Sequence, residues 1–255
     1  MHEGMKLEHI TELVQQVRKT HAKMGGKKLY HLLQPDLSRM SGRFGRDKFF
    51  ALLKQKQLLV KRRRKYAVTT QSSHWFRVYD NKLKTLKPAR PDQGWVCDIT
   101  YVRIRKGFVY LFLLTDVYSR KIVGWEVSNS LSVEGAIKAV GKAVRQCKNP
   151  KDLIHHSDRG FQYCSHEYVK ILKKAGIQIS MGEAGNCYDN AMAERVNGIL
   201  KQEYSLDNTF ANEQQVRQAA RQGINAYNES RPHWALKLDT PSNVHRKKQQ
   251  VKCDN

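Results

Sequence analysis

The segments "WVCDITYVRI" (residues 95–104) and "GFVYLFLLTDVYSRKIVGWEVS" (residues 107–128) lie next to each other in the chain. Both are rich in β-branched, aromatic and other apolar residues, which favour strands. A polar interruption at residues 116–120 divides the second segment into two strand candidates. The pattern predicts a meander of three strands. It also places Asp98 in the middle of the first strand, where a charge is costly unless it is paired or bound to a metal.

Helices and strands alternate after this meander. Apolar residues at helical spacing predict a helix over residues 133–147, and Asp189 or Asn190 is a suitable cap for a later helix. Strands followed by alternating strands and helices indicate an α/β layer fold with a mixed sheet. The remaining predicted elements are the strands "DLIHHSD" and "QISM" and the helices "SHEYVKILKKAGI", "NAMAERVNGILKQEY" and "NEQQVRQAARQGINAYNESR".

The N-terminal part predicts three short helices. They are "LEHITELVQQV" (residues 7–17), "KKLYHLL" (residues 27–33), which ends before Pro35, and "GRDKFFALLKQKQLLV" (residues 45–60). Three basic helices joined by tight turns fit a helix-turn-helix module. Arg46 and Lys48 lie near the start of the third helix, where such helices meet the edges of bases. A three-helix bundle without this function is the alternative.

The charge distribution indicates a polyanionic partner. The 255 residues carry a net charge of +23, and residues 1–90 alone hold 22 Lys and Arg against 6 Asp and Glu, a net charge of +16. Such an excess is typical of proteins that bind nucleic acid. Five consecutive cations at residues 61–65 include Arg62, Arg63 and Arg64, which we expect to contact phosphates.

These patterns predict four regions. A helix-turn-helix domain occupies residues 1–65, a basic linker residues 66–92, an α/β core residues 93–245 and a basic tail residues 246–255. The five cysteines form no Cys-x-x-Cys pair, so neither a zinc site nor a disulfide framework is expected. No apolar run reaches about 18 residues, and no signal peptide is recognisable, which predicts a cytoplasmic protein.

Three carboxylates are candidates for metal binding. Asp98 lies within a strand, Asp158 follows another strand, and Glu194 lies on a later helix, with 59 and 35 residues between them. Phosphodiester chemistry by two Mg²⁺ ions needs oxygen ligands of this kind and no protein nucleophile. Most Asp and Glu residues are surface groups, so the three acids alone prove little.

The sequence around these acids resembles a known family. Five segments carry the resemblance: "WVCDITYV", "FLLTDVYSRKIVGWEVS", "LIHHSDRGFQYCS", "GNCYDNAMAERVNGILKQE" and "YNESRPHWALKLDTPSNV". They resemble the successive motifs of bacterial insertion-sequence transposases with a retroviral-integrase-type core, over about residues 91–245. The N-terminal "GRDKFFALLKQKQLLVKRRRKY" resembles the helix-turn-helix segment of that family's frame-B products.

The resemblance implies a ribonuclease-H-like fold and a catalytic triad of Asp98, Asp158 and Glu194. It implies two Mg²⁺ ions, with Mn²⁺ as a substitute. The expected activity is binding of the element's terminal inverted repeats, cleavage of the 3′ ends and joining to target DNA. The expected partners are double-stranded DNA, further copies of the chain and an upstream-frame partner or fusion, at the bacterial nucleoid. A DNA-binding regulator with an inactive core and a nuclease without strand transfer are the rival functions.

The sequence also suggests roles for individual residues near the triad. Helical spacing places Asn190 and Lys201 on the face of Glu194. Lys201 would hold a phosphate or would simply be solvated, and Asn190 would contact a ligand or DNA or cap its helix. His156 is a candidate outer partner of a metal ligand, or else a core histidine. Arg231 and His233 contact DNA or lock the last helix to the core. Asp116 is expected to be a structural partner of nearby Ser or Arg groups.

Overall fold

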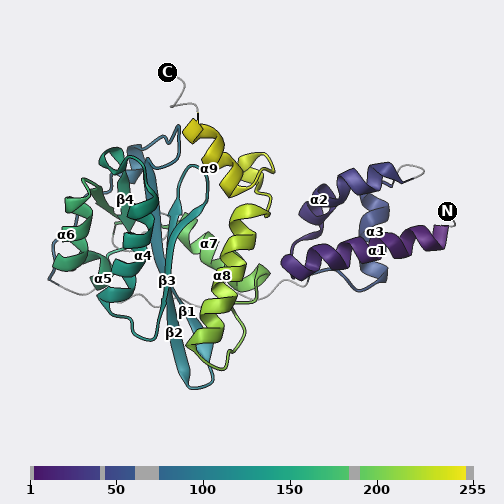
Figure 1. The fold of residues 1–255 in the computed structure, drawn as a ribbon, viewed down its shortest axis with the longest axis horizontal. Coiled ribbons are helices and arrows are strands. Elements are labelled where there is room, and N and C mark those ends of the chain that lie inside the picture. The colour runs from purple at the N-terminus through teal and green to yellow at the C-terminus, as the bar shows by residue number, and fades with distance from the viewer. Residues whose placement is uncertain (1–2, 41–43, 61–74, 184–189, 251–255) are drawn as a thin grey trace.

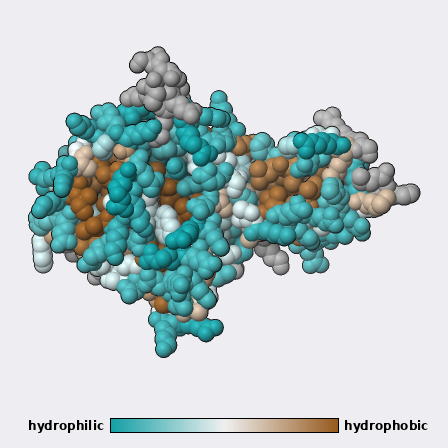
Figure 2. Space-filling view, viewed as in Figure 1, coloured by the Kyte–Doolittle hydropathy of each residue, from teal (hydrophilic) through white to brown (hydrophobic). Residues whose placement is uncertain are grey.

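Figure 1 shows the computed structural model, which describes residues 3–40, 44–60, 75–183 and 190–250. Three helices, α1 (Glu3–Thr20), α2 (Gly26–Arg39) and α3 (Arg46–Gln55), form an N-terminal unit beside a larger α/β part. Apolar residues gather separately in the two parts (Figure 2). The cluster inside the N-terminal unit includes Ile10, Val14, Leu29, Leu33, Leu37, Phe49 and Leu53.

Helix α2 differs from the sequence expectation. It continues through Pro35 to Arg39, whereas the sequence predicted that it ends before the proline. A proline inside a helix removes one hydrogen bond and costs about 3 kcal/mol. Leu33 and Leu37, one on each side of Pro35, are both buried in the cluster of the N-terminal unit. The packing of these two leucines offsets the cost of the proline.

A five-stranded mixed sheet forms the centre of the α/β part. Its strands are β1 (Gly94–Ile104), β2 (Gly107–Asp116), β3 (Ile122–Ser128), β4 (Ile154–Ser157) and β5 (Gln178–Met181). Their order is β3-β2-β1-β4-β5. The first three strands are an antiparallel meander, and β4 and β5 run parallel to β1. The predicted mixed sheet is confirmed.

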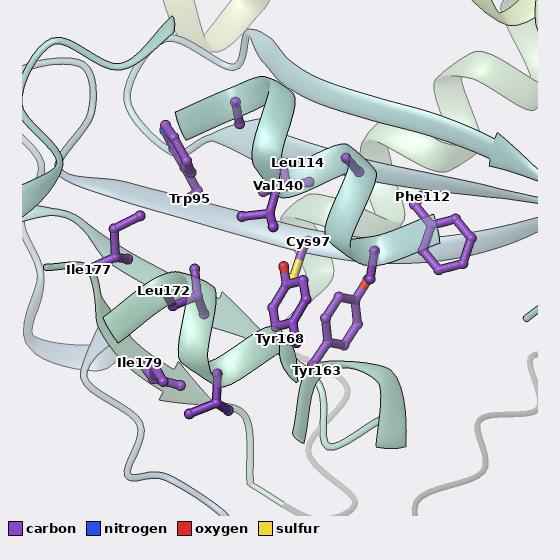
Figure 3. Packing of buried hydrophobic residues seen from close by; sticks show 14 of the residues in the cluster. Trp95, Cys97, Phe112, Leu114, Val140, Tyr163, Tyr168, Leu172, Ile177 and Ile179 are labelled. Carbon is purple, nitrogen blue, oxygen red and sulfur yellow. The ribbon is translucent and has the colours of Figure 1, made fainter. Parts of the chain in front are cut away.

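Helices cover both faces of this sheet (Figure 1). On one face lie α4 (Val133–Gln146), α5 (Phe161–Cys164) and α6 (His166–Lys174), and on the other α7 (Ala191–Glu203) and α8 (Glu213–Glu229). Alternate residues of β1 therefore enter different cores. No helix within the described ranges has both the length and the apolar character that a bilayer crossing requires. The core under α4 and α6 includes Trp95, Cys97, Phe112, Leu114, Val140 and Leu172 (Figure 3).

Two glycines allow α4 to lie close to the sheet. A Cβ atom on Gly135 would lie 2.3 Å from the Phe112 ring, and one on Gly124 would lie 2.5 Å from the Ala139 carbonyl oxygen. Neither space admits a side chain. The close contact seals the core under α4, which supports the β1 residues on that side.

Two segments pack more closely than their polar sequences suggested. In the linker, a 3₁₀ turn (Leu83–Thr85) places Leu83 and Leu86 against Val96, and the Lys82 amide donates to Ser180 Oγ at 2.9 Å. Near the C-terminus, α9 (Pro241–Gln250) packs along α8. No apolar periodicity in the sequence predicted α9.

The N-terminal unit contacts the α/β part through a buried histidine. His21 lies with Nδ1 3.0 Å from Tyr204 Oη and Nε2 3.0 Å from Ser230 Oγ. The Lys23 amide donates to the Glu203 carbonyl oxygen at 3.3 Å. These contacts join the end of α1 to the ends of α7 and α8.

Candidate active site

The register of two parallel strands brings Asp98 and Asp158 side by side. Gly94 pairs with Ile154 and Val96 with His156, an offset of 60 residues. The same offset places Asp98 opposite Asp158, just past the end of β4. Neighbouring strands are about 4.8 Å apart, and residues in register share a face of the sheet. Both carboxylates therefore lie on the face that α7 covers.

Helix α7 supplies the third carboxylate. Its residues Met192 and Ala193 pack on Val96, two positions before Asp98. Glu194 follows in the first turn of α7 and is exposed. The side chains of the sequence-predicted triad thus come from β1, the end of β4 and the start of α7.

The pKa of Asp98 depends on both other carboxylates of the predicted triad. Burial, the Asp158 carboxylate and, to a smaller extent, Glu194 raise the pKa of Asp98 to about 7, against hydrogen bonds that favour its charged form. Burial also raises the pKa of Asp158, whose Oδ1 accepts the Gly160 amide at 3.0 Å. Crowded carboxylates with raised pKa values are the donor set that a divalent cation relieves. The carboxylate donors present therefore fit Mg²⁺ by their chemistry, while the ligand atoms of Asp98, Asp158 and Glu194 do not all lie within 4.8 Å of one another.

We expect the metal-free protein to lose stability with rising pH because of Asp98. A carboxyl whose folded-state pKa is raised stabilises the fold most below its ordinary pKa near 3.8, and that contribution is lost as pH rises through about 7. The loss is on the order of 4 kcal/mol at most. Thermal melting in EDTA should show Asp98→Asn gaining stability over the wild-type chain between pH 4 and pH 8. A pH-independent difference would contradict this assignment.

Asn197 is a site residue that the sequence reasoning missed. Its Nδ2 donates to Asp98 Oδ2 at 2.8 Å, and its side chain is 5% exposed. It lies three residues after Glu194, so both residues share one face of α7. This hydrogen bond favours the charged form of Asp98 and fixes its orientation. A polar residue at a buried helical position three residues from a candidate ligand was the signal available in the sequence.

Replacing Asn197 by alanine should weaken the site without unfolding it. Loss of an outer hydrogen bond to a metal ligand typically costs about 10–100-fold in metal affinity or activity. The pKa of Asp98 should rise further, so the acid limb of the pH–rate profile should move to higher pH. Gln202→Ala, an exposed change on the same helix, serves as the control. An unchanged pH profile in Asn197→Ala would refute the positioning role.

Two further predicted residues of α7 lie near the triad. Asn190 occupies the cap position, but its side chain makes no capping bond, and Nδ2 instead donates to the Cys97 carbonyl oxygen at 3.2 Å. Lys201 is half-buried; burial lowers its pKa, while the Asp98 carboxylate opposes that change. Lys201 therefore lies within electrostatic reach of the candidate metal ligands.

The two histidines of β4 are core residues. His155 Nε2 lies 2.8 Å from Tyr168 Oη and 3.3 Å from Cys97 Sγ, behind the strand that carries Asp98. His156 is fully buried, and its Nδ1 lies 2.8 Å from Ser180 Oγ. Its role as an outer partner of a metal ligand stays a prediction. The cysteines that the structure describes are free, which agrees with a packing role.

The burial of Arg231 and His233 favours one of the two sequence-based alternatives, a lock of the last helix to the core, over a DNA contact. Arg231 is 1% exposed, and its Nε and Nη2 donate to the two Glu203 carboxylate oxygens at 2.7 and 2.6 Å. His233 is buried against Tyr227 and lies 3.0 Å from Arg231 Nη1. The alternative, a lock between the end of α8 and the rest of the core, is what these contacts show.

The N-terminal cations divide into described and undescribed residues. Arg46 and Lys48 are exposed in the first turn of α3, which starts one residue after the predicted helix and ends at Gln55, five residues before its predicted end. Arg62, Arg63 and Arg64 lie outside the described residues. The exposed position of Arg46 and Lys48 is compatible with DNA contact.

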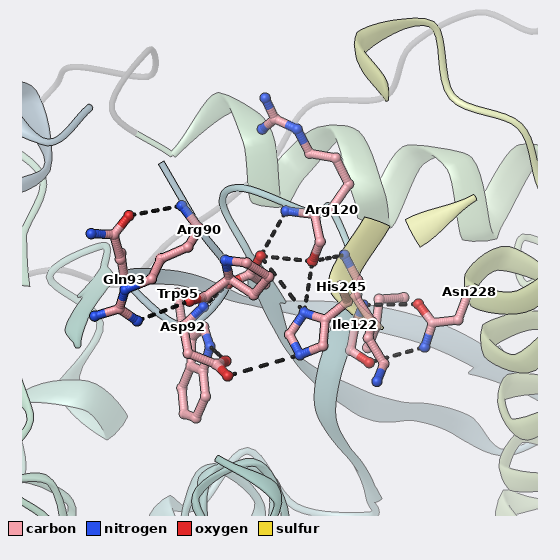
Figure 4. Close-up of polar contacts among 12 residues, drawn as sticks. Arg90, Asp92, Gln93, Trp95, Arg120, Ile122, Asn228 and His245 are labelled. Carbon is pink, nitrogen blue, oxygen red and sulfur yellow. Dashed lines mark hydrogen bonds and ion pairs between the residues drawn. The ribbon is translucent and has the colours of Figure 1, made fainter. Parts of the chain in front are cut away.

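A second acidic cluster lies at the start of the sheet (Figure 4). Among the described residues, one group of at least three His, Cys, Asp or Glu side chains has ligand atoms that all lie within 4.8 Å of one another. It consists of Asp92, Asp116 and His245. Asp116 accepts the Asp92 amide at 2.8 Å and both the amide and hydroxyl of Ser119 at 2.7 and 2.6 Å. Protein donors thus engage both Asp116 oxygens. Because His245 belongs to α9, we interpret the cluster as a set of polar contacts that hold α9 against the sheet. The predicted pairing of Asp116 with a nearby Ser is confirmed.

Comparison with protein families gives two matches in the α/β part. An integrase core domain family matches residues 88–187, and a second integrase core domain family matches residues 175–241. Together they span the sheet, α7 and α8, including all three candidate ligands.

The chain is similar to proteins of bacterial insertion elements. It is 38% identical over 221 residues to the insertion element IS600 uncharacterized 31 kDa protein of Shigella sonnei, covering 86% of this chain and 81% of the relative. It is 41% identical over 142 residues to the transposase for insertion sequence element IS629 of Shigella sonnei, covering 56% and 48%. It is 36% identical over 154 residues to transposase InsF for insertion sequence IS3A of Escherichia coli, covering 60% and 54%. The match spans about half the length of the latter two relatives.

Solved structures support the fold. The HTLV-2 integrase catalytic core domain in complex with magnesium matches with a TM-score of 0.50 at 20% identity, covering 62% of this chain and 99% of that chain. A simian T-cell lymphotropic virus intasome chain matches with a TM-score of 0.52 at 16% identity, covering 87% and 74%. These matches confirm the predicted integrase-type α/β fold.

Proposed function

Since the chain belongs to the integrase-core family of insertion-sequence transposases, we propose that it cuts and joins DNA at the ends of a mobile element. In this proposal Asp98, Asp158 and Glu194 are the catalytic carboxylates. The observation that supports it is the β1–β4 register, which, when continued by two residues, sets Asp98 opposite Asp158 on the face that α7, the helix of Glu194, covers.

The three carboxylates would hold two Mg²⁺ ions. Bound there, the ions would lower the pKa of an attacking hydroxyl and stabilise the leaving oxygen. Asn197 would keep Asp98 charged and oriented, and Lys201 would hold a phosphate of the substrate. Cleavage would use water as the nucleophile, and joining would use the freed 3′-hydroxyl against a phosphate of the target.

The substrate of this chemistry would be double-stranded DNA. The proposed sources are the terminal inverted repeats and the target, at the bacterial nucleoid. The N-terminal unit would read the repeats as a helix-turn-helix, with Arg46 and Lys48 at the start of α3 in the major groove. The excess of positive charge in residues 1–90 supports this use, with Arg62, Arg63 and Arg64 on phosphates.

Joining needs two DNA ends at once, which implies an assembly of several chains. We propose a homo-oligomer on DNA, with an upstream-frame partner or fusion as a further component. One of the solved structures that share the fold is itself part of an intasome, which is compatible with such an assembly.

A joining assay tests the proposed function. A duplex with a precut repeat end from the element that encodes the chain, a supercoiled target plasmid and Mg²⁺ are incubated with the full-length chain. Covalent end-to-plasmid product is expected, and it should disappear in EDTA and return with Mn²⁺. Cleaved but never joined DNA would identify a nuclease, and repeat binding without any chemistry would identify a regulator; either result would overturn the proposal.

A further inference from the structure

The β1–β2 hairpin carries an exposed strip of aromatic and cationic side chains that the proposed chemistry does not use. Its members, hereafter the hairpin strip, are Tyr101, Arg103, Phe108 and Tyr110. Tyr101 pairs across the strands with Tyr110, and Arg103 pairs with Phe108. Directly opposed residues point to the same face of a hairpin, so the four side chains form one surface.

The burial of the hairpin is one-sided. On its other face Val102 and Val109 are each 1% exposed in the core under α7 and α8. On the face of the strip, Tyr101 is 39% and Phe108 45% exposed. In Figure 1 the hairpin extends beyond the ends of α4 and α8, so no helix of the described chain covers its tip.

The side chains of the strip are held in place by one another. Tyr101 makes edge-to-face contacts with Phe108 and Tyr110, at centroid distances of 6.3 and 5.1 Å. The Arg103 guanidinium carbon lies 4.9 Å from the centre of the Phe108 ring. Side chains that are ordered before binding lose less conformational entropy when a partner arrives.

The charge of the hairpin selects the kind of partner. Between Asp98 and Asp116 the sequence has three cations, Arg103, Arg105 and Lys106, and no carboxylate. Arg105 and Lys106 form the turn and are exposed. A second copy of a chain with a net charge of +23 would meet repulsion at such a surface, whereas a polyanion would be attracted.

We propose that the hairpin strip, which lies on the face of the sheet opposite Asp98, binds the backbone of duplex DNA independently of base sequence. Arg103 and Lys106 would neutralise phosphates, and the rings of Tyr101 and Phe108 would cover the neighbouring sugars. The inference rests on the proposed function, because it assumes that the chain acts on duplex DNA.

Binding of a random-sequence duplex of about 30 base pairs to the full chain tests this inference, without any need for chemistry. Affinity is measured against salt concentration for the wild type, Arg103→Ala/Lys106→Ala and Phe108→Ser. Lys173→Ala/Lys174→Ala removes two exposed cations of α6 and is the matched control. Thermal melting verifies that each variant is folded, and Arg103→Glu, a single exposed change, replaces any variant that is not.

The expected result is a loss of roughly tenfold in affinity in Arg103→Ala/Lys106→Ala. Its log–log salt slope should become shallower by about 1.8, since each phosphate contributes about 0.9. Phe108→Ser should lose affinity with an unchanged slope, and the control should match the wild type. Wild-type affinity and slope in the hairpin variants would overturn the inference, as would a loss confined to self-association in sedimentation without DNA. If the wild type binds no DNA at all, the proposed function fails as well.

Discussion

Asp158→Asn is expected to lower the rate of end joining at least about 10³-fold. A bound metal stabilises the charge of the transition state by several kcal/mol, and each 1.4 kcal/mol is a factor of ten in rate. The amide keeps the size of the side chain and can still accept the Gly160 amide, so the turn after β4 should remain. Binding of the repeat duplex should therefore be unchanged. Joined product is quantified on gels under single-turnover conditions.

Asp152→Asn is the matched control for this prediction. Asp152 precedes β4 and is exposed. Its Oδ2 lies 3.2 Å from Arg90 Nη2 in an ion pair at the surface. Its substitution should leave joining within about twofold of wild type, since exposed pairs contribute little. Full joining activity in Asp158→Asn would remove Asp158 from the catalytic site.

Arg231→Met is expected to destabilise the α/β part by about 3–5 kcal/mol. In the wild-type chain the Glu203 carboxylate accepts two charge-assisted hydrogen bonds from Arg231. The substitution removes this cation and leaves the carboxylate in place. Removing one member of a buried ion pair costs more than the pair contributes, because the remaining charge stays desolvated. The melting temperature should fall by about 10 °C, at 2–4 °C for each kcal/mol in a chain of this size.

Arg246→Met provides the comparison for Arg231. Arg246 also pairs with a glutamate, Glu229 at 3.3 Å, but its side chain is 58% exposed. We expect Arg246→Met to change the free energy of unfolding of the protein by less than about 1 kcal/mol. If Arg231→Met melted like the wild type and lost only DNA affinity, the result would favour the other alternative, a DNA contact of Arg231.

The central strands and the candidate ligands could be predicted from sequence because their signals are local. The meander follows from the strand-forming residues of β1 to β3, and Asp98 is conspicuous as a charge inside such a strand. The helix that bears Glu194 follows from apolar spacing and a capping residue. The expectation that they converge needed the resemblance to the transposases, since no local pattern fixes which strands become neighbours.

What the sequence could not predict depends on contacts between distant segments. Pro35 stays inside α2 because leucines on both sides are buried in a common core. Arginine is a residue type that often contacts DNA, but Arg231 is buried because it pairs with Glu203, 28 residues away. Asn197 acts on Asp98 across 99 residues. In each case a tertiary partner outweighs the preference that the residue type shows alone.

The most direct test of the proposed triad is an anomalous difference map from manganese-soaked crystals of the chain bound to repeat-end DNA. Manganese peaks about 2.1 Å from carboxylate oxygens of Asp98, Asp158 and Glu194 are the predicted result. Absence of manganese among these three side chains, with a peak at Asp92, Asp116 and His245 instead, would contradict it.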